Sequence, residues 1–172
     1  MSSKKLEKLL IDCIQENKES AYRLAFSYVK NQQDALDIVQ ESIRKSFTSV
    51  SSLKNKTVIK SWFFRIVVNT SLDFLRKKKR IQLVDDETLE MISPGTEDRY
   101  PNVDLEKAME ELPHKYRVIV ILRFFEDMKI EEISAVLNEK ISTVKTRLYK
   151  ALRLLKEQLL DEELEEVQEY GP

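Results

Sequence analysis

The sequence predicts an all-α protein made of two small helical domains, and three observations indicate this class. Glycine occurs only at Gly95 and Gly171 in 172 residues, which leaves few tight turns. Apolar residues make up 42 % of the chain and recur at steps of three and four, the period of helices that bury one face. An acidic stretch containing the helix breakers Pro94 and Pro101 interrupts this period. We therefore expect helices on both sides of a flexible linker over 81–103.

The first domain, residues 1–80, is expected to hold four helices. The apolar positions place these helices at about 5–15, 20–30, 34–50 and 61–80. Asn31 is expected to close the second of them. The third has Ala35, Ile38, Val39, Ile43 and Phe47 as its apolar stripe. The polar stretch 49–57 between the third and fourth helices predicts a loop.

The fourth helix carries more information than any other segment. Helical spacing places Phe63, Phe64, Val67, Val68, Phe74 and Leu75 on one apolar arc, which we expect to face the core. Trp62, Arg65, Asn69, Asp73 and Arg76 follow one another along the opposite side. Five consecutive cations, 76–80, end the helix. An aromatic ring, an amide and guanidinium groups beside a cationic end suit unstacked bases and phosphates.

The second domain, residues 104–160, is expected to contain a helix-turn-helix. The predicted helices cover about 105–112, 114–126, 130–137 and 142–160, with Pro113 stopping the first and Ser142 capping the last. Val118, Ile119, Leu122 and Phe125 form the apolar stripe of the second. Asn138 can take the left-handed conformation that a tight exit from the third helix needs. Two short helices joined by such a turn are typical of a helix-turn-helix.

The final helix divides into an apolar and a polar face. Val144, Leu148, Ala151 and Leu155 share one side, and Thr143, Thr146, Arg147, Lys150 and Arg153 share the other. In a helix-turn-helix the second helix enters the major groove, where Lys and Arg reach guanine and Thr contacts thymine. A basic face can also be merely solvated, but the preceding short helix and turn favour the DNA interpretation.

The net charge of −1 hides blocks of opposite sign. Residues 1–80 hold 17 cations and 8 anions, and residues 81–110 hold 2 and 9. Residues 111–158 hold 10 and 7, and residues 159–172 hold 6 anions and no cation. The two cationic blocks suit a polyanion, whereas the linker and the acidic tail, 161–172, would avoid one or mimic it.

Composition excludes several kinds of site. A single cysteine, Cys13, and a single histidine, His114, allow no internal disulfide, no cysteine zinc site and no histidine-based triad. We see no catalytic residue, no metal site and no cofactor motif, so an enzyme is not expected. No apolar run approaches the ~18 residues of a membrane span, and no signal peptide precedes the first charges. We expect a soluble, cytoplasmic protein.

Three ordered blocks of sequence resemble bacterial RNA polymerase sigma factors of the extracytoplasmic-function group. The first is Asp-Ala-Leu-Asp-Ile-Val-Gln-Glu at 34–41, and the second is Ser-Trp-Phe-Phe-Arg-Ile at 61–66 with the polar residues and cations that follow it. The third runs from Glu-Leu-Pro at 111–113 through Glu-Glu-Ile at 131–133 to Thr-Val-Lys-Thr-Arg-Leu-Tyr-Lys-Ala at 143–151. The resemblance covers about 15–160 and is strongest to the sigma-V type.

The resemblance implies a role for each block. Residues 1–80 would be sigma region 2 and residues 104–160 region 4, whose helix-turn-helix reads the −35 element. Polymerase docking would use Asp34, Asp37, Ile38, Gln40 and Glu41. Contacts to the −10 element would use Trp62, Arg65, Asn69, Arg76, Lys77, Lys78 and Arg80, with Leu53, Lys54 and Asn55 in a base-capturing loop. Contacts to the −35 element would use Thr143, Lys145, Thr146, Arg147 and Lys150.

Two of these side chains have a second interpretation. Trp62 could stack on a base or simply pack. Asp73 is expected to be a structural partner for a nearby arginine, because a carboxylate repels phosphate. The turn at 137–140 lacks the small residue that the family often has there, and Asn138 is expected to replace it.

The resemblance also implies partners. These are core RNA polymerase, through its β′ clamp and β flap, promoter DNA, and a membrane-bound anti-sigma factor, with no membrane insertion of the chain itself. A cell-envelope stress response is the implied setting. Two other classes stay open at this point: a free-standing helix-turn-helix regulator that dimerises through 1–80, and a helical adaptor that binds no nucleic acid.

Overall fold

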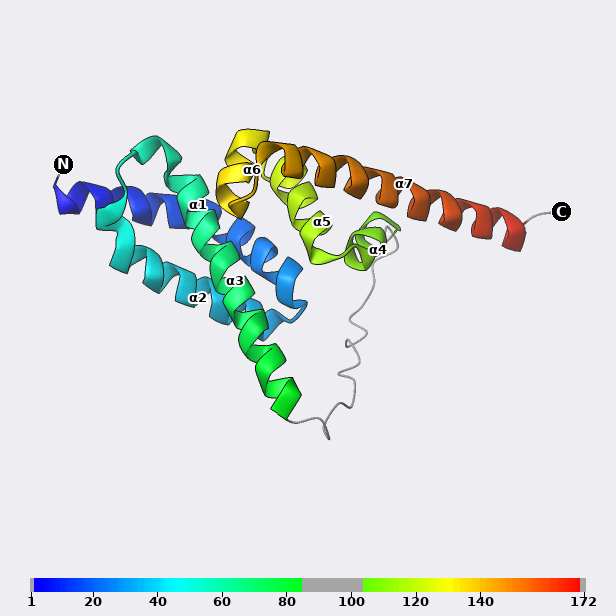
Figure 1. Ribbon diagram of the computed structural model, residues 1–172, viewed down its shortest axis with the longest axis horizontal. Coiled ribbons are helices and arrows are strands. Elements are labelled where there is room, and N and C mark those ends of the chain that lie inside the picture. Colours follow the sequence, from blue (N-terminus) through cyan, green and yellow to red (C-terminus); the bar gives the residue numbers. More distant parts are fainter. Residues whose placement is uncertain (1, 85–103, 171–172) are drawn as a thin grey trace.

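The computed structural model of the protein describes residues 2–84 and 104–170, and every regular element within these ranges is helical (Figure 1). The first half contains α1 (Ser3–Val29), α2 (Gln32–Ser49), the 3₁₀ turns η1 (Val50–Ser52) and η2 (Lys56–Val58), and α3 (Ile59–Val84). The second contains α4 (Asp104–Glu111), α5 (His114–Val120), the π-helical turn η3 (Ile121–Phe125), α6 (Ile130–Leu137) and α7 (Ile141–Tyr170). The all-α prediction is confirmed. Most of the predicted linker lies outside the described residues.

The first domain has three α-helices, not the predicted four. The segments expected at 5–15 and 20–30 form one continuous helix, α1. The intervening residues 15–20 are polar but contain no Gly or Pro, so nothing there ends a helix. The Asn17 side chain even donates to the Cys13 carbonyl oxygen one turn back, at 2.8 Å. Polarity alone therefore marked an exposed stretch of helix rather than a break.

The three helices pack against one another around the predicted apolar arc of α3. Phe63, Phe64 and Val67 are fully buried and meet Leu10 and Leu24 of α1 in the core. Each such side chain contributes about 1.5–3 kcal/mol on leaving water. This burial fixes α3 about its axis, so its polar face must point outward.

The turn between α1 and α2 is set by two polar residues. Lys30 takes the left-handed conformation (φ 52°) and its N–H bonds the Phe26 carbonyl oxygen. Asn31 then caps α2, because its side chain accepts from the Asp34 N–H at 2.9 Å. Asn31 was expected to close the preceding helix. The closing residue is Lys30, one position earlier.

The second domain matches the predicted helix-turn-helix, with two corrections. Asn138 is left-handed (φ 53°) as expected, α7 packs on α5, and α6 packs on α7 and η3. Ser142 lies inside α7, which begins at Ile141, and is not the N-cap. Phe125 was expected to be buried but is 52 % exposed. The π-helical turn adds a residue per turn there, which rotates Phe125 off the apolar stripe.

The two halves pack directly on each other, which the sequence did not indicate. Helix α6 lies on α3, and α5 contacts the C-terminal part of α1 (Figure 1). One cluster of buried apolar residues runs from Leu24 of α1 and Val68 of α3 to Ile119 of α5 and Ile133 of α6. We refer to this as the closed arrangement. Helix α7 continues past it to Tyr170, ten residues beyond the predicted end.

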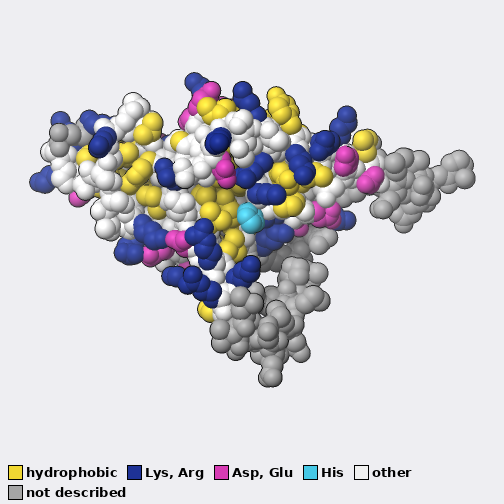
Figure 2. All heavy atoms as spheres, in the orientation of Figure 1, with side chains coloured by type: hydrophobic (Ala, Val, Ile, Leu, Met, Phe, Trp, Pro, Cys, Tyr) yellow, Lys and Arg dark blue, Asp and Glu magenta, His cyan; other side chains and the backbone are white. Residues whose placement is uncertain are grey.

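We predict that His114 makes this packing sensitive to acid. Its ring lies 5.4 Å from that of Tyr28 across the contact (Figure 2, cyan). Partial burial, together with Arg117 and Lys115, lowers the pKa of His114 below its ordinary 6.5. The folded state therefore favours neutral His114. Its contribution to the free energy of unfolding is fully present above pH 6.5 and is lost as the pH falls below that value.

We accordingly expect the free energy of unfolding to decrease as the pH is lowered from 7.5 to 5.5. The replacement His114→Gln, which cannot gain a proton, should reduce that decrease. Urea unfolding at several pH values measures both proteins. His114 is the single histidine of the chain, and few other groups titrate in this window. An unchanged pH dependence in His114→Gln would show that His114 does not sense acid here.

Candidate nucleic-acid and polymerase interface

The polar side of α3 is exposed along the whole first domain. Arg65 and Asn69 are exposed one turn apart, and Arg76, Lys77 and Arg80 extend the same side toward the end of the helix. Figure 2 shows Lys and Arg side chains gathered over this part of the molecule. Because the opposite face holds the core, these groups face outward, where Arg65, Lys77 and Arg80 can meet a polyanion.

Trp62 begins this row but differs from its neighbours. It is half-buried and packs against the core cluster. Its ring therefore serves the fold, while its outer part remains accessible. Of the two interpretations of Trp62, packing is established, and the exposed edge leaves contact with a base open.

The loop before α3 carries exposed lysines and Asn55, whose side-chain oxygen is already hydrogen-bonded within the loop. Lys54 is exposed and Leu53 is half-buried. The Asn55 side-chain oxygen accepts from both the N–H and the hydroxyl of Thr57, at 3.1 and 2.7 Å, and so caps η2. Asn55 therefore has a structural role, and its amide NH₂ is the part left for a ligand.

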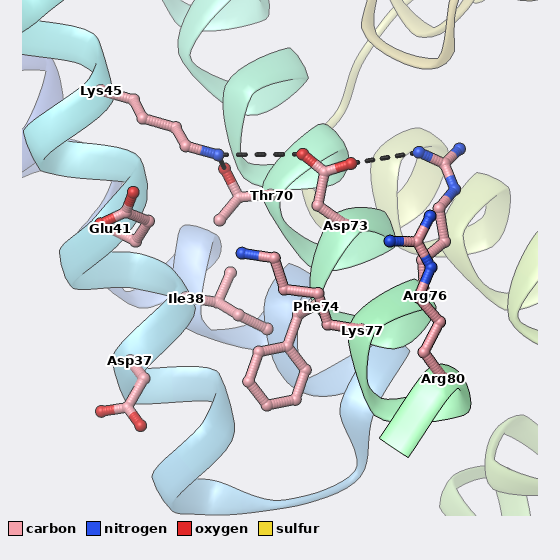
Figure 3. Close-up of a pocket in the computed structure, with 10 residues that line it drawn as sticks. All are labelled: Asp37, Ile38, Glu41, Lys45, Thr70, Asp73, Phe74, Arg76, Lys77 and Arg80. Atoms are coloured by element: carbon pink, nitrogen blue, oxygen red, sulfur yellow. Dashed lines mark hydrogen bonds and ion pairs between the residues drawn. The ribbon is translucent and has the colours of Figure 1, made fainter. Parts of the chain in front are cut away.

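A groove of about 510 Å³ runs between α2 and α3 and brings two predicted sites together (Figure 3). Asp37 and Glu41 line it from α2, opposite Lys77 and Arg80 of α3. Ile38 forms part of its wall but is almost fully buried, so it supports α2 from beneath. The predicted docking edge and the predicted −10 face thus share a border.

Ion pairs cross that border. Asp73 lies 3.1 Å from Arg76 Nη1 and 3.9 Å from Lys45 Nζ (Figure 3), which confirms its structural pairing with an arginine. Lys78 Nζ lies 3.8 Å from a carboxylate oxygen of Asp34. Lys78 therefore holds α3 to α2, while Lys77, Lys79 and Arg80 remain exposed. Exposed pairs of this kind add at most about 1 kcal/mol each.

Glu41 is already paired within its own helix. Its carboxylate accepts from Arg44 Nε at 2.9 Å, and this bond holds the pKa of Glu41 below its usual range. Asp37 is exposed, and within residues 2–84 and 104–170 its carboxylate accepts a bond from the side-chain amide of Gln33 alone, at 3.1 Å. Among the acids of α2, Asp37 is therefore the carboxylate with most capacity for a basic partner.

Two features beside these helices escaped the sequence-based reasoning. Leu36, 42 % exposed, stands next to Asp37 and Gln40 on the outer face of α2, where its position off the apolar stripe was the available signal. A second hollow, of about 340 Å³, opens beside Asn69. It is lined by Arg44, Lys45, Thr48, Ser49, Ile66, Asn69 and Thr70. The loop side of α2 was not predicted to face Asn69, because that pairing depends on tertiary packing.

Helix α7, the recognition helix of the predicted helix-turn-helix, exposes only some of the side chains predicted to contact the −35 element. Lys145 and Thr146 are exposed, whereas Arg147 is half-buried and its Nη1 lies 3.3 Å from Glu139 Oε1. Lys150 is exposed, but its Nζ lies 5.4 Å from the centre of the Tyr116 ring. Thr143 is half-buried at the first turn. Lys145 is thus the cation most available to a base edge.

Tyr149 belongs to the same exposed surface. It is 71 % exposed, and it follows Lys145 by one helical turn. Tyr149 was not among the residues predicted to contact the −35 element, although it lies within the matching block 143–151. Its spacing from Val144 and Leu148, which define the buried face, was the signal that could have identified it.

Neither a metal centre nor a membrane helix emerges from the part of the chain that the structure describes. No three His, Cys, Asp or Glu side chains there come together in a way that could hold a metal ion. No helix within it combines the length and the apolar character that crossing a membrane requires.

Comparison with known proteins places both halves of the chain. A family model described as sigma-70 region 2 matches residues 13–81, and one described as sigma-70 region 4 matches residues 102–155. The RNA polymerase sigma factor SigV of Bacillus subtilis is 57 % identical over 156 residues, which cover 91 % of this chain and 94 % of that protein. The ECF RNA polymerase sigma factor SigW of the same organism is 27 % identical, covering 87 % and 88 %.

A solved structure shares the arrangement of helices. The sigma factor RpoE in complex with the anti-sigma factor NepR, from Bartonella quintana, superposes with a TM-score of 0.71 at 25 % identity. The match covers 86 % of this chain and 96 % of that one.

Proposed function

The chain belongs to the sigma-70-like family of bacterial RNA polymerase sigma factors, in its extracytoplasmic-function group, and on that premise we propose how its surfaces divide the work. The first domain docks on core polymerase and meets the −10 element, and the second reads the −35 element. One observation carries this proposal: each domain leaves one cationic helix face exposed while its opposite face is core, as α3 and α7 both do.

For the −10 element, α3 supplies a base contact and phosphate contacts in sequence. Asn69, which lines the 340 Å³ hollow, bonds a base edge. Arg65 and the exposed cations Lys77, Lys79 and Arg80 meet phosphates along the same side. Lys54 of the preceding loop extends this cationic side, and Asn55 offers its amide NH₂.

For the −35 element, α7 enters the major groove with its first two turns. Lys145 donates to guanine, and Thr146 contacts the neighbouring base. The Thr146 hydroxyl donates to the Ser142 carbonyl oxygen at 2.9 Å, so its oxygen keeps the capacity to accept from a base, and its methyl group can contact thymine. Arg147, held by Glu139, and Lys150 stand at the sides of the groove and meet backbone.

Docking on core polymerase uses the outer face of α2. Asp37 and Gln40 flank the exposed Leu36 there, an arrangement that fits a basic, amphipathic partner helix. Asp34 is paired with Lys78, and Glu41 is paired with Arg44. These two carboxylates therefore contribute more to the shape of this face of α2 than to its affinity for polymerase.

An anti-sigma factor completes the proposal. A groove of about 530 Å³ lies between the halves of the chain, with Phe26, Met109, Ile121 and Phe125 among its lining residues. An apolar groove of this size suits the apolar face of a helix. The chain acts in the cytoplasm, where polymerase and promoters are, and the anti-sigma factor is membrane-bound and answers to envelope stress.

The proposal is tested by adding the purified protein to core polymerase and scoring run-off transcripts from a promoter library. We expect transcripts that require both components. A free-standing regulator would instead bind a palindromic site tightly without polymerase. A helical adaptor would give neither result, and replacing Asn69 and Lys145 by Ala would change nothing.

A further inference from the structure

Two helix C-termini meet where the halves of the chain touch. Helix α1 ends at Val29 and α4 ends at Glu111, and polar contacts join the two ends. The last carbonyl groups of any helix lack a partner within it and carry partial negative charge. At this contact, each helix end is met by a cation from the other domain.

The first cation is Arg117 of α5. It is only 6 % exposed, and Nη2 donates to the Ser27 carbonyl oxygen in the last turn of α1. Nη1 donates to the Glu110 carbonyl oxygen at 3.0 Å, in the last turn of α4. Arg117 therefore ties its own domain to the end of α1 through backbone carbonyls, which no side-chain change on α1 removes.

The second cation is Lys30 of the first domain, which bonds to the second domain. Its left-handed backbone ends α1, and its Nζ reaches across to the Glu110 carbonyl oxygen at 2.8 Å. Partial burial and the nearby Arg117 lower the pKa of Lys30 from its usual range. The two domains thus exchange C-terminal caps: Arg117 caps α1, and Lys30 caps α4.

A charged pair borders these caps. Arg23 of α1 lies 3.4 Å from Glu126 Oε1, whose side chain is 5 % exposed, and its guanidinium lies 5.6 Å from the Phe125 ring centre. These groups can all be hydrated once the halves separate. They border the buried apolar cluster that joins the two halves, so the contact combines an apolar part with a polar, charged edge.

In the closed arrangement, the two helices proposed to contact DNA, α3 and α7, lie too close together to reach both promoter elements at once. The centres of a −10 and a −35 element are about 25 base pairs apart, or about 85 Å at about 3.4 Å per base pair. Helix α6 lies directly on α3, at the ~8–10 Å typical of packed helices, and α7 follows after three residues. The 19 residues 85–103 can reach about 65 Å when extended, so the chain length permits separation.

We propose that Lys30 and Arg117 form a latch that holds region 4 on region 2 in the free protein, and that this latch opens before both promoter elements are bound. The first part concerns the free chain alone. The second part rests on the proposed function. The latch would keep the two reading surfaces from engaging one promoter until polymerase and DNA separate them.

The test measures the distance between spin labels on cysteines introduced at the exposed Thr48 of α2 and Lys156 of α7, with the buried Cys13 replaced by Ala throughout. The variants are Arg117→Met and Lys30→Met, which keep the aliphatic stem and remove the cation. Lys5→Met, exposed at the other end of α1, is the matched control. Circular dichroism establishes that each variant is folded, and Lys30 is exposed enough to be replaced if Arg117→Met does not fold.

We expect one short distance in the free wild type and in the control. Both latch variants should gain a second population, longer by tens of Å, and raise the open fraction by about tenfold or more. A free wild type that is already open, or folded latch variants that keep the wild-type distance, would overturn the latch. Adding core polymerase and promoter DNA should open the wild type. If it stays closed while the variants open, the latch stands and the promoter role is wrong.

Discussion

Replacing Lys77, Lys79 and Arg80 together by Gln is expected to weaken binding of the holoenzyme to all promoters alike. These cations are exposed near the end of α3, whereas their neighbour Lys78 is paired with Asp34 and is left unchanged. Phosphate contacts carry no sequence information, so the order of preference among promoters should survive. Each lost contact removes about 0.7–0.9 from the slope of log affinity against log salt, so the slope should fall by about 2.

The measurement is a salt titration of promoter affinity, in which the triple variant is compared with a matched control. Lys4, Lys5 and Lys8 of α1 are exposed and contribute the same charge, so their replacement by Gln alters net charge equally. We expect the control to keep a slope near that of the wild type. Equal slopes for both variants would show that net charge, not the end of α3, determines binding.

The second large effect is expected from Lys145→Ala, which should relax preference within the −35 element. Lys145 is exposed at the start of the recognition helix, and no acidic partner holds it among the described residues. A good base contact contributes about 1–3 kcal/mol of discrimination, or about 5- to 150-fold between the best and a mismatched base. Arg147→Ala should cost less specificity, because Glu139 already engages its guanidinium.

Competition between matched and mismatched −35 sequences measures this discrimination. Lys156→Ala serves as the control, because Lys156 is exposed on the same helix three turns farther along. Loss of affinity for matched and mismatched DNA by the same factor would mean that Lys145 contacts backbone. In that case Tyr149 and Thr146 would be the remaining candidates for reading bases.

Local patterns predicted much of the architecture. The apolar arc of α3, the buried face of α7 and the left-handed turn at Asn138 follow from spacing and from single-residue preferences. The same reasoning wrongly predicted two helices in place of α1. A polar stretch without Gly or Pro looks like a loop when its neighbours in space are unknown. The prediction that Phe125 is buried was also wrong, because a π-helical turn shifts the helical period by one residue.

Tertiary contacts could not be read from the sequence. Arg117 meets the Ser27 carbonyl oxygen, ninety residues earlier in the chain, because α5 packs on the end of α1. The pairing of Lys78 with Asp34 has the same origin, and it changes how the cation run is interpreted. Sequence spacing identified the exposed faces, and only packing distinguished the cations that hold helices together from those left for DNA.

One measurement tests most directly whether two separate surfaces read two elements. A promoter library randomised at both elements is transcribed by core polymerase with the wild type, with Asn69→Ala or with Lys145→Ala, and the transcribed promoters are sequenced. We predict that Asn69→Ala loses preference only at −10 positions and Lys145→Ala only at −35 positions. Loss of preference at the same positions in both variants, or none in either, would contradict the account.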